Sequence, residues 1–139
     1  MTEMPAIDMK FGIIVATEYA EYNAMCLETL EATLLKLGCL PQNIVVREVP
    51  TKHDVVITTS FFAEYTDVDG VIILAPEGTL ADDATYMTAI LACQLQWNMV
   101  VEVGGIECAY NIVEMILLQN EMEDNAPQEA RVRIKTSFS

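Results

Sequence analysis

Residues 45–54 of the chain, VVREVPTKHD, join an apolar β-branched run to a proline and then to a polar turn. The run predicts a strand, and Pro50 ends it because proline cannot donate a hydrogen bond to a neighbouring strand. The turn holds His53, the one histidine of the sequence. Two interpretations are open. In the first, a helix starts here and its free N–H groups, with Lys52 and His53, hold an anion. In the second, the turn is solvated and Asp54 caps the helix.

Outward from this stretch, apolar runs alternate with helical patterns. Continuous runs such as FGIIVA and DGVIILA are typical of strands buried on both faces. Residues 52–65 have strong strand propensity, but we assign them to a helix because a crossover is needed there. Gly38 is expected to end the first helix, and Asp82 or Asp83 to cap the third. The predicted strands are 11–16, 43–49, 69–75 and 99–103, and the predicted helices are 20–37, 52–65, 84–97 and 106–118.

This alternation predicts a single α/β domain over 1–125. A parallel sheet of four strands would lie between two layers of helices, as in flavodoxin-like folds. Residues 120–130 have the composition of a linker, and 126–139 are expected to form a C-terminal tail.

The tail contains a segment, 131–138, in which apolar and basic residues alternate. The pattern predicts either a fifth strand, which could also pair with a neighbouring subunit, or a tail without regular structure. One side of such a strand would carry Val132, Ile134 and Phe138, and the other Arg131, Arg133 and Lys135.

The charge of the chain limits its partners. A net charge of −14, from 21 acidic and 7 basic residues, repels nucleic acid and anionic membranes, so neither is expected as a partner. No apolar run reaches the roughly 18 residues of a membrane span. The first ten residues, MTEMPAIDMK, lack the basic start and apolar block of a signal peptide. We therefore expect a soluble, cytoplasmic protein.

The four cysteines are widely spaced, form no C-x-x-C pair and have no histidine near them. This arrangement argues against zinc sites and redox-active pairs. Cys26, Cys93 and Cys108 fall within helical patterns and are expected to be buried free thiols. Neither a metal site nor a cofactor is predicted.

In parallel sheets ligands bind at the carboxyl ends of the strands. The loops there lack a glycine-rich nucleotide motif and a Walker lysine. The first loop also lacks the hydroxyl-rich run with which a flavodoxin wraps phosphate, because Thr17 is its one such residue. The loops that we expect at this edge are 17–23, 50–54, 75–83 and 104–105.

Two of these loops offer ligand-binding side chains. Tyr19 or Tyr22 could stack on a flat heteroaromatic ligand, or could simply pack the first helix against the sheet. In APEGTLADD, Gly78 allows close approach of a ligand and Thr79 offers a hydroxyl. The carboxylates of this loop disfavour phosphate but suit a polyol, an amine or a divalent cation, or else form a solvated acidic loop. These carboxylates are Glu77, Asp82 and Asp83.

The motifs of the chain resemble those of the lumazine synthase family. LLKLGCLPQNIVVREVP is similar to the family's L-x-x-L-G helix end followed by an N-I-x-V-x-x-V-P strand. DGVIILA is similar to its D-A-V-I-A-L-G strand, and ECAYNIVEM to its last helix. The resemblance covers roughly residues 11–118. It implies a parallel α/β sheet and a homo-oligomer, commonly a pentamer or a shell of pentamers.

The chain departs from the family at three places. Thr51 replaces the glycine of V-P-G, and the G-x-T-x-H motif is reduced to Gly78-Thr79 without its histidine. The basic residues of a later loop, which hold a phosphate in the family, are missing. Tyr22-Asn23 matches in type the aromatic-asparagine pair whose ring stacks on the pyrimidine, but it comes a few residues late.

The resemblance implies condensation of a ribitylamino-pyrimidine with a ketose phosphate, in riboflavin biosynthesis. Proton transfer and phosphate binding would then fall on His53, Lys52 and Arg47. The alternative is a catalytically inactive homo-oligomer that binds a ligand or only assembles. The expected catalytic residue is His53, and the expected ligand-binding residues are Tyr22, Asn23, Thr51, Lys52, Asp54, Gly78 and Thr79.

Overall fold

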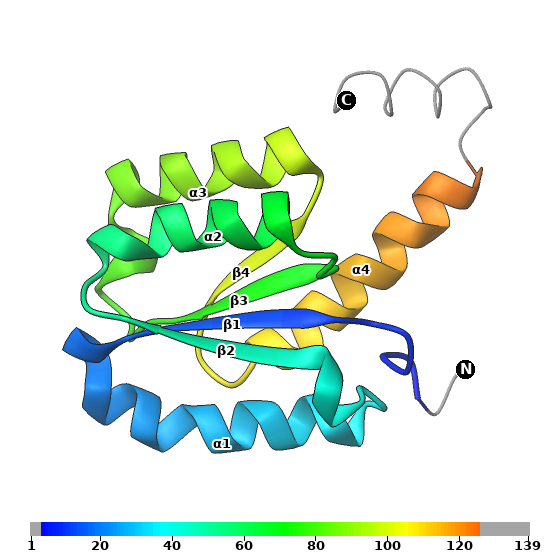
Figure 1. Ribbon diagram of the computed structural model, residues 1–139, viewed down its shortest axis with the longest axis horizontal. Helices are drawn as coiled ribbons and strands as arrows, with labels where there is room; N and C mark the ends of the chain where they lie inside the picture. Colours follow the sequence, from blue (N-terminus) through cyan, green and yellow to red (C-terminus); the bar gives the residue numbers. More distant parts are fainter. Residues whose placement is uncertain (1–3, 126–139) are drawn as a thin grey trace.

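The computed structural model describes residues 4–125, in which four strands alternate with four α-helices (Figure 1). Three short 3₁₀ turns, η1 to η3, lie between them. The strands are β1 Phe11–Ala16, β2 Ile44–Val49, β3 Gly70–Leu74 and β4 Val100–Gly104. The helices are α1 Ala20–Lys36, α2 His53–Tyr65, α3 Ala84–Trp97 and α4 Cys108–Asn125, and the 3₁₀ turns are η1 Thr17–Tyr19, η2 Pro41–Asn43 and η3 Leu80–Asp82.

The strands form one parallel sheet in the order β2-β1-β3-β4. Helices α1 and α4 cover one face, and α2 and α3 cover the other (Figure 1). The predicted fold class, a parallel α/β sheet between two helical layers, is therefore confirmed. The predicted fifth strand, 131–138, lies outside the described residues.

Each face of the sheet has its own buried core, because successive strand side chains point to opposite faces. On one side, Leu34 of α1 and Ile112 of α4 pack on Phe11 and Ile13. On the other side, residues of α2 and α3 pack on Ile14, Val71 and Ile73. The Phe62 ring of α2 lies on Gly12 of β1, where a β-carbon would come within 2.6 Å of the ring.

The ambiguous segment 52–65 is a helix, as predicted, although its residues favour strands. Val55, Thr59 and Phe62 are buried against the sheet, and this packing outweighs local propensity. Asp83 caps α3, also as predicted: its carboxylate accepts a hydrogen bond of 3.1 Å from Thr85 N. The φ of +105° at Gly38 ends α1.

The predicted linker is wrong where it begins, because α4 continues to Asn125 instead of ending at Leu118. Residues 120–125 are exposed, so they show no apolar pattern. Extension of an existing helix costs little, so a polar segment continues it. The rest of the predicted tail lies outside the described residues.

The predicted burial of the thiols holds for Cys93 and Cys108, whereas Cys26 is partly exposed. Cys39 is also buried. None of the helices in residues 4–125 combines the length and apolar character needed to cross a bilayer.

Candidate functional site

The carboxyl ends of the four strands lie together at one end of the sheet, on the left in Figure 1. The loops that follow β1, β2, β3 and β4 meet there, as expected for a parallel sheet. Tyr22 and Asn23 belong to the first turn of α1 rather than to a loop.

The turn between β2 and α2 is held by a reciprocal capping arrangement. The Asp54 carboxylate accepts hydrogen bonds from Thr51 N at 3.2 Å and from Thr51 Oγ1 at 3.1 Å. Thr51 Oγ1 in turn accepts one from His53 N at 3.2 Å. This is the pattern of a capping box, so Thr51 and Asp54 fix where α2 begins.

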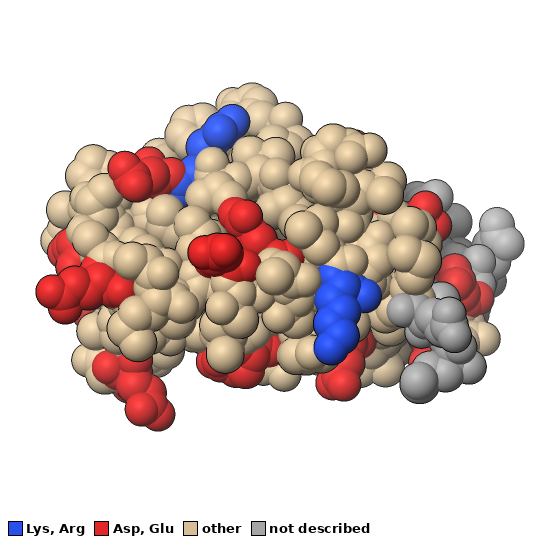
Figure 2. Space-filling model, turned by 90° about the horizontal axis from the view of Figure 1, so that it is seen from below, with Lys and Arg blue, Asp and Glu red and all other residues tan. Residues whose placement is uncertain are grey.

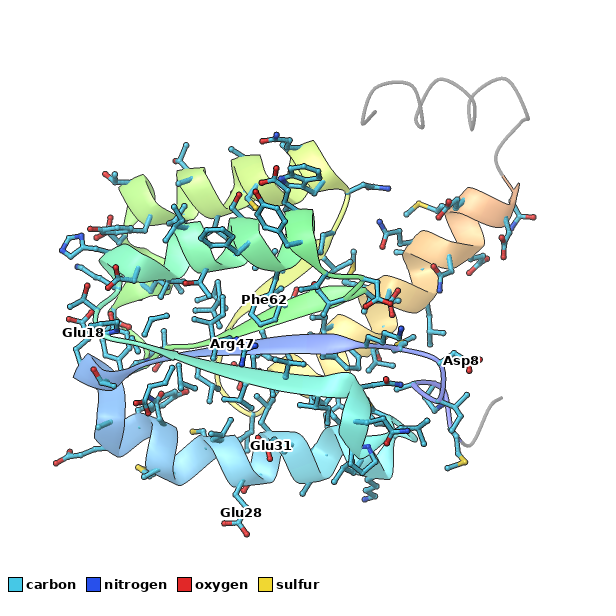
Figure 3. The ribbon with its side chains drawn as sticks, viewed as in Figure 1. Asp8, Glu18, Glu28, Glu31, Arg47 and Phe62 are labelled. Carbon is cyan, nitrogen blue, oxygen red and sulfur yellow. The ribbon has the colours of Figure 1, made fainter. Side chains whose placement is uncertain are left out.

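The amide that an anion would use at this helix start already has an acceptor. Glu18, in η1, accepts a hydrogen bond of 2.8 Å from Lys52 N. Thr17 Oγ1 donates a bond of 2.8 Å to Pro50 O and so holds η1 against the turn. Figure 3 shows Glu18 at this end of the sheet. A phosphate would have to displace a carboxylate of the chain itself.

The Lys52 and His53 side chains reach towards α3. The Lys52 ammonium lies 3.5 Å from the Asp83 carboxylate and 5.2 Å from the centre of the Tyr86 ring. His53 Nδ1 is hydrogen-bonded to the Tyr86 hydroxyl, and the two rings meet edge to face with 5.4 Å between their centres. Sequence reasoning missed Tyr86. The available signal was its position three residues after the Asp83 cap, which places Tyr86 in the first turn of α3, at the same edge of the sheet.

A hollow of about 540 Å³ lies beside this network. It contains Lys52, Gly78 and Thr79, three of the predicted ligand-binding residues. Asp82 fills the space next to Gly78, whose N–H donates to its carboxylate at 2.7 Å. With three carboxylates against one ammonium, the hollow favours hydroxyl or amine groups over phosphate. Its lining residues are Glu18, Tyr19, Lys52, Gly78, Thr79, Asp82, Asp83 and Ala84.

A second hollow, of about 400 Å³, shares Glu18 and Tyr19 with the first and also contains Tyr22. A β-carbon at Gly105 would collide with the Tyr22 hydroxyl, so glycine leaves room for it. Burial, with smaller effects from the Cys26 thiol and Glu107, raises the pKa of Tyr22 to about 12. Tyr22 is therefore a neutral hydroxyl at physiological pH.

Two of the expected residues lie elsewhere. Asn23 Nδ2 donates a hydrogen bond of 2.8 Å to Ala16 O, and Asn23 lines a separate hollow beside α1 with Glu28. Arg47 lines another hollow, between β2 and α2, next to Phe62 (Figure 3). The structure thus brings Lys52, Gly78 and Thr79 together, and separates Asn23 and Arg47 from them.

The β4 edge of the sheet carries two ionisable groups, the half-buried Glu102 and, at the start of α4, the buried Cys108. Burial raises the pKa of Glu102 on β4, and the negative charge of Glu107 raises it further. A hydrogen bond with Asn111 lowers the pKa in part. Burial raises the pKa of Cys108 to about 12. Within residues 4–125, no group of three or more histidine, cysteine or acidic side chains is placed to hold a metal ion.

Similarity to known proteins points to one family. The chain is 33% identical over 66 residues to a 6,7-dimethyl-8-ribityllumazine synthase of Bacteroides fragilis. It is 36% identical over 69 residues to the enzyme of that name from Parabacteroides distasonis. The chain is similar to lumazine synthase.

The similarity is partial. It covers 48% and 50% of this chain, and the chain spans less than half of the two relatives, 46% and 43%. No protein-family model matches the chain. The four-stranded parallel sheet agrees with a lumazine-synthase-like fold.

Proposed function

We propose that the chain is a lumazine-synthase-like protein of riboflavin biosynthesis that binds a ribitylamino-pyrimidine at the carboxyl ends of its strands. The observation that carries the proposal is the acidic hollow around Lys52, which adjoins a hollow that holds Tyr22. Carboxylates accept hydrogen bonds from the hydroxyls of a ribityl chain. A tyrosine ring offers a face on which a pyrimidine can stack.

The expected residues then divide by task. His53, held by the Tyr86 hydroxyl, would transfer protons, since an imidazole can both donate and accept one. Lys52, Gly78 and Thr79 would contact the ligand, and Tyr22 its ring. Thr51 and Asp54 would hold the start of α2 in place, and Asn23 the connection from β1 to α1.

Phosphate is the part of the reaction that the described residues support least. The N–H groups of Lys52 and Gly78, which could cradle it, donate to Glu18 and Asp82 instead. We therefore expect the ribitylamino-pyrimidine to bind by itself, and a ketose phosphate to bind weakly when offered alone.

Calorimetric titration of each substrate, followed by fluorescence of the lumazine product when both are present, tests the proposal. Binding of the pyrimidine that is lost in Lys52→Met and kept in Glu114→Gln, on the exposed surface of α4, would support the site. The absence of both pyrimidine binding and turnover in a folded chain would refute it. Binding without turnover would identify a diverged member that has lost the reaction.

A second candidate function, a catalytically inactive homo-oligomer, is favoured by the outer surface of α2 and α3. The 14 residues of α3 contain no charged side chain. Leu95 is 73% exposed, and Ile57 of α2 is 58% exposed. Exposed apolar surface of this kind usually marks a contact with another protein.

Light scattering, with the absorption spectrum of the same peak, tests this second candidate. An assembly without product formation would support it. A monomer at all concentrations would refute it. Absorbance between roughly 350 and 450 nm in the same peak would favour the first candidate, because it would indicate a conjugated heteroaromatic ligand stacked in the site.

A further inference from the structure

Strand β2 is an edge of the sheet. Within residues 4–125 it pairs only with β1, so its outer row of N–H and C=O groups has no partner strand. Open edges of this kind are templates for strand addition, and proteins usually protect them.

The two sides of this edge differ in chemistry. On the side of α2, a hollow of about 550 Å³ lies against Val45 and Arg47 of β2. Its wall is aromatic: Phe61 is 53% exposed and Tyr65 is 69% exposed, with ring centres 5.5 Å apart. Phe62, which lies between α2 and the sheet (Figure 3), also lines this hollow.

On the side of α1, the edge is acidic. Glu48 of β2 and Glu28 of α1 line a hollow of about 360 Å³. Glu31 follows one turn later on α1 (Figure 3). None of these three carboxylates forms an ion pair with another residue of 4–125. Acidic surface outweighs basic surface on this face of the molecule (Figure 2).

One segment of the chain matches both sides. In RVRIKTSF, residues 131–138, apolar residues alternate with basic ones. A strand of this sequence would present Val132, Ile134 and Phe138 to one face of the sheet and its three basic residues to the other. By contrast, residues 4–125 hold 19 acidic and 4 basic side chains.

We propose that residues 131–138 of a second copy add as a strand to the open edge of β2. Their apolar side chains would fill the aromatic hollow beside α2, and their basic side chains would lie over Glu28, Glu31 and Glu48. If the added strand were turned over, its arginines would lie beside Arg47 on the α2 side, and such a like-charge contact destabilises strand pairing. This inference rests on the self-association proposed above.

A second copy is the better donor because α4, from which the chain continues, packs beside β4 and not beside β2. Helix α4 packs beside β4, at the other edge of the sheet, and runs past its end (Figure 1). Strands β4 and β2 are three strand spacings apart, a distance of about 14 Å across the sheet. The nine residues of α4 after Ile116 carry the chain about 14 Å further along the helix axis. The six steps from Asn125 to Arg131 span at most about 20–22 Å. The chain's own segment would therefore cover the diagonal of about 20 Å only with a fully extended link, whereas a second copy needs no such link.

A charge-swap experiment on the full chain, read by light scattering, tests the proposal. The donor variant is R131E/R133E/K135E and the acceptor variant is E28K/E31K/E48K. Each should weaken association by roughly tenfold or more, and the chain with all six changes should recover it. E114K/E121K/E123K, on exposed positions of α4, is the matched control and should assemble normally.

The outcomes separate this inference from the proposed association. If the donor variant keeps the wild-type mass while a charge on α3 (L95E) dissociates the assembly, association stands and strand addition is wrong. If the six-change chain does not recover, the pairing of these two surfaces is wrong. If the wild-type chain is monomeric throughout, both proposals fail. The donor changes lie outside the described residues 4–125, which contain both cores, so circular dichroism should show an unchanged fold.

Discussion

The two faces of the sheet are alike inside and different outside. Both bury a continuous apolar core, centred on Leu30 and Leu34 under α1 and on Phe62 and Ile90 under α2 and α3. The outer surfaces of α1 and α4 are acidic, whereas α3 has no charge at all. Folding requires the inner faces to be apolar, but nothing in folding requires an uncharged outer surface. The difference therefore favours the proposed contact through the outer surface of α3.

The largest effects should be the same on both faces, because they arise in the cores. Leu34→Ala and Ile90→Ala each remove a buried side chain that is at most 1% exposed. Each should lower the free energy of unfolding by about 2–5 kcal/mol. Urea titration followed by circular dichroism measures this. A loss below about 1 kcal/mol on one side would mean that this face is not a packed core.

A matched pair of surface substitutions sharpens the comparison. Leu95 on α3 is 73% exposed and Met25 on α1 is 76% exposed. Leu95→Glu should weaken self-association by at least about 2 kcal/mol, because it places a carboxylate in an apolar contact. Met25→Glu should leave the mass in solution unchanged. Equal masses of the two variants and the wild type by light scattering would remove the distinction between the faces.

At the carboxyl ends of the strands, Glu18→Gln tests whether the Glu18 carboxylate occupies the place at the N-terminus of α2 where an anion would bind, next to Lys52 N. The change should cost about 0.3–1 kcal/mol, since a negative charge near a helix N-terminus is stabilising. It should also raise the affinity for inorganic phosphate, measured by calorimetry. Glu77→Gln, an exposed carboxylate in a neighbouring loop, is the control. Equal phosphate binding by both variants would contradict this role of Glu18.

The smallest effect concerns Glu102, a carboxylate on the acidic side of the sheet whose pKa is raised mainly by burial. A raised folded-state pKa favours the protonated form. Glu102 therefore contributes stability below its unfolded pKa and loses it as pH rises through the folded value. Glu102→Gln should be more stable than wild type at pH 7, and the gain should shrink towards pH 4. Urea midpoints at the two pH values measure this, and a constant gain would contradict it.

Local patterns predicted most of the elements. The runs FGIIVA and DGVIILA are strands because their residues are buried on both faces, and burial of this kind is visible in the sequence. Asp83 was recognisable as a cap because capping is a local hydrogen bond. The end of α4 was missed because its last turns are exposed and therefore carry no apolar pattern.

The site was predicted less completely. Sequence reasoning placed Lys52, Gly78 and Thr79 at one edge, and the structure brings them into one hollow. It grouped Arg47 with Lys52, although Arg47 faces another hollow. The catalytic role of His53, the exclusion of nucleic-acid partners and the cytoplasmic location stay predictions.

The sequence by itself determined the alternation of strands and helices, and with it a parallel sheet with a ligand-binding edge, because periodicity and burial are encoded within a few residues. Only the tertiary structure decided which residues meet at that edge. Glu18 contacts Lys52 across 34 positions, and His53 meets Tyr86 across 33. Such contacts depend on the order β2-β1-β3-β4, which also leaves β2 open. Strand order is set by how whole elements pack together, so no local pattern reveals it.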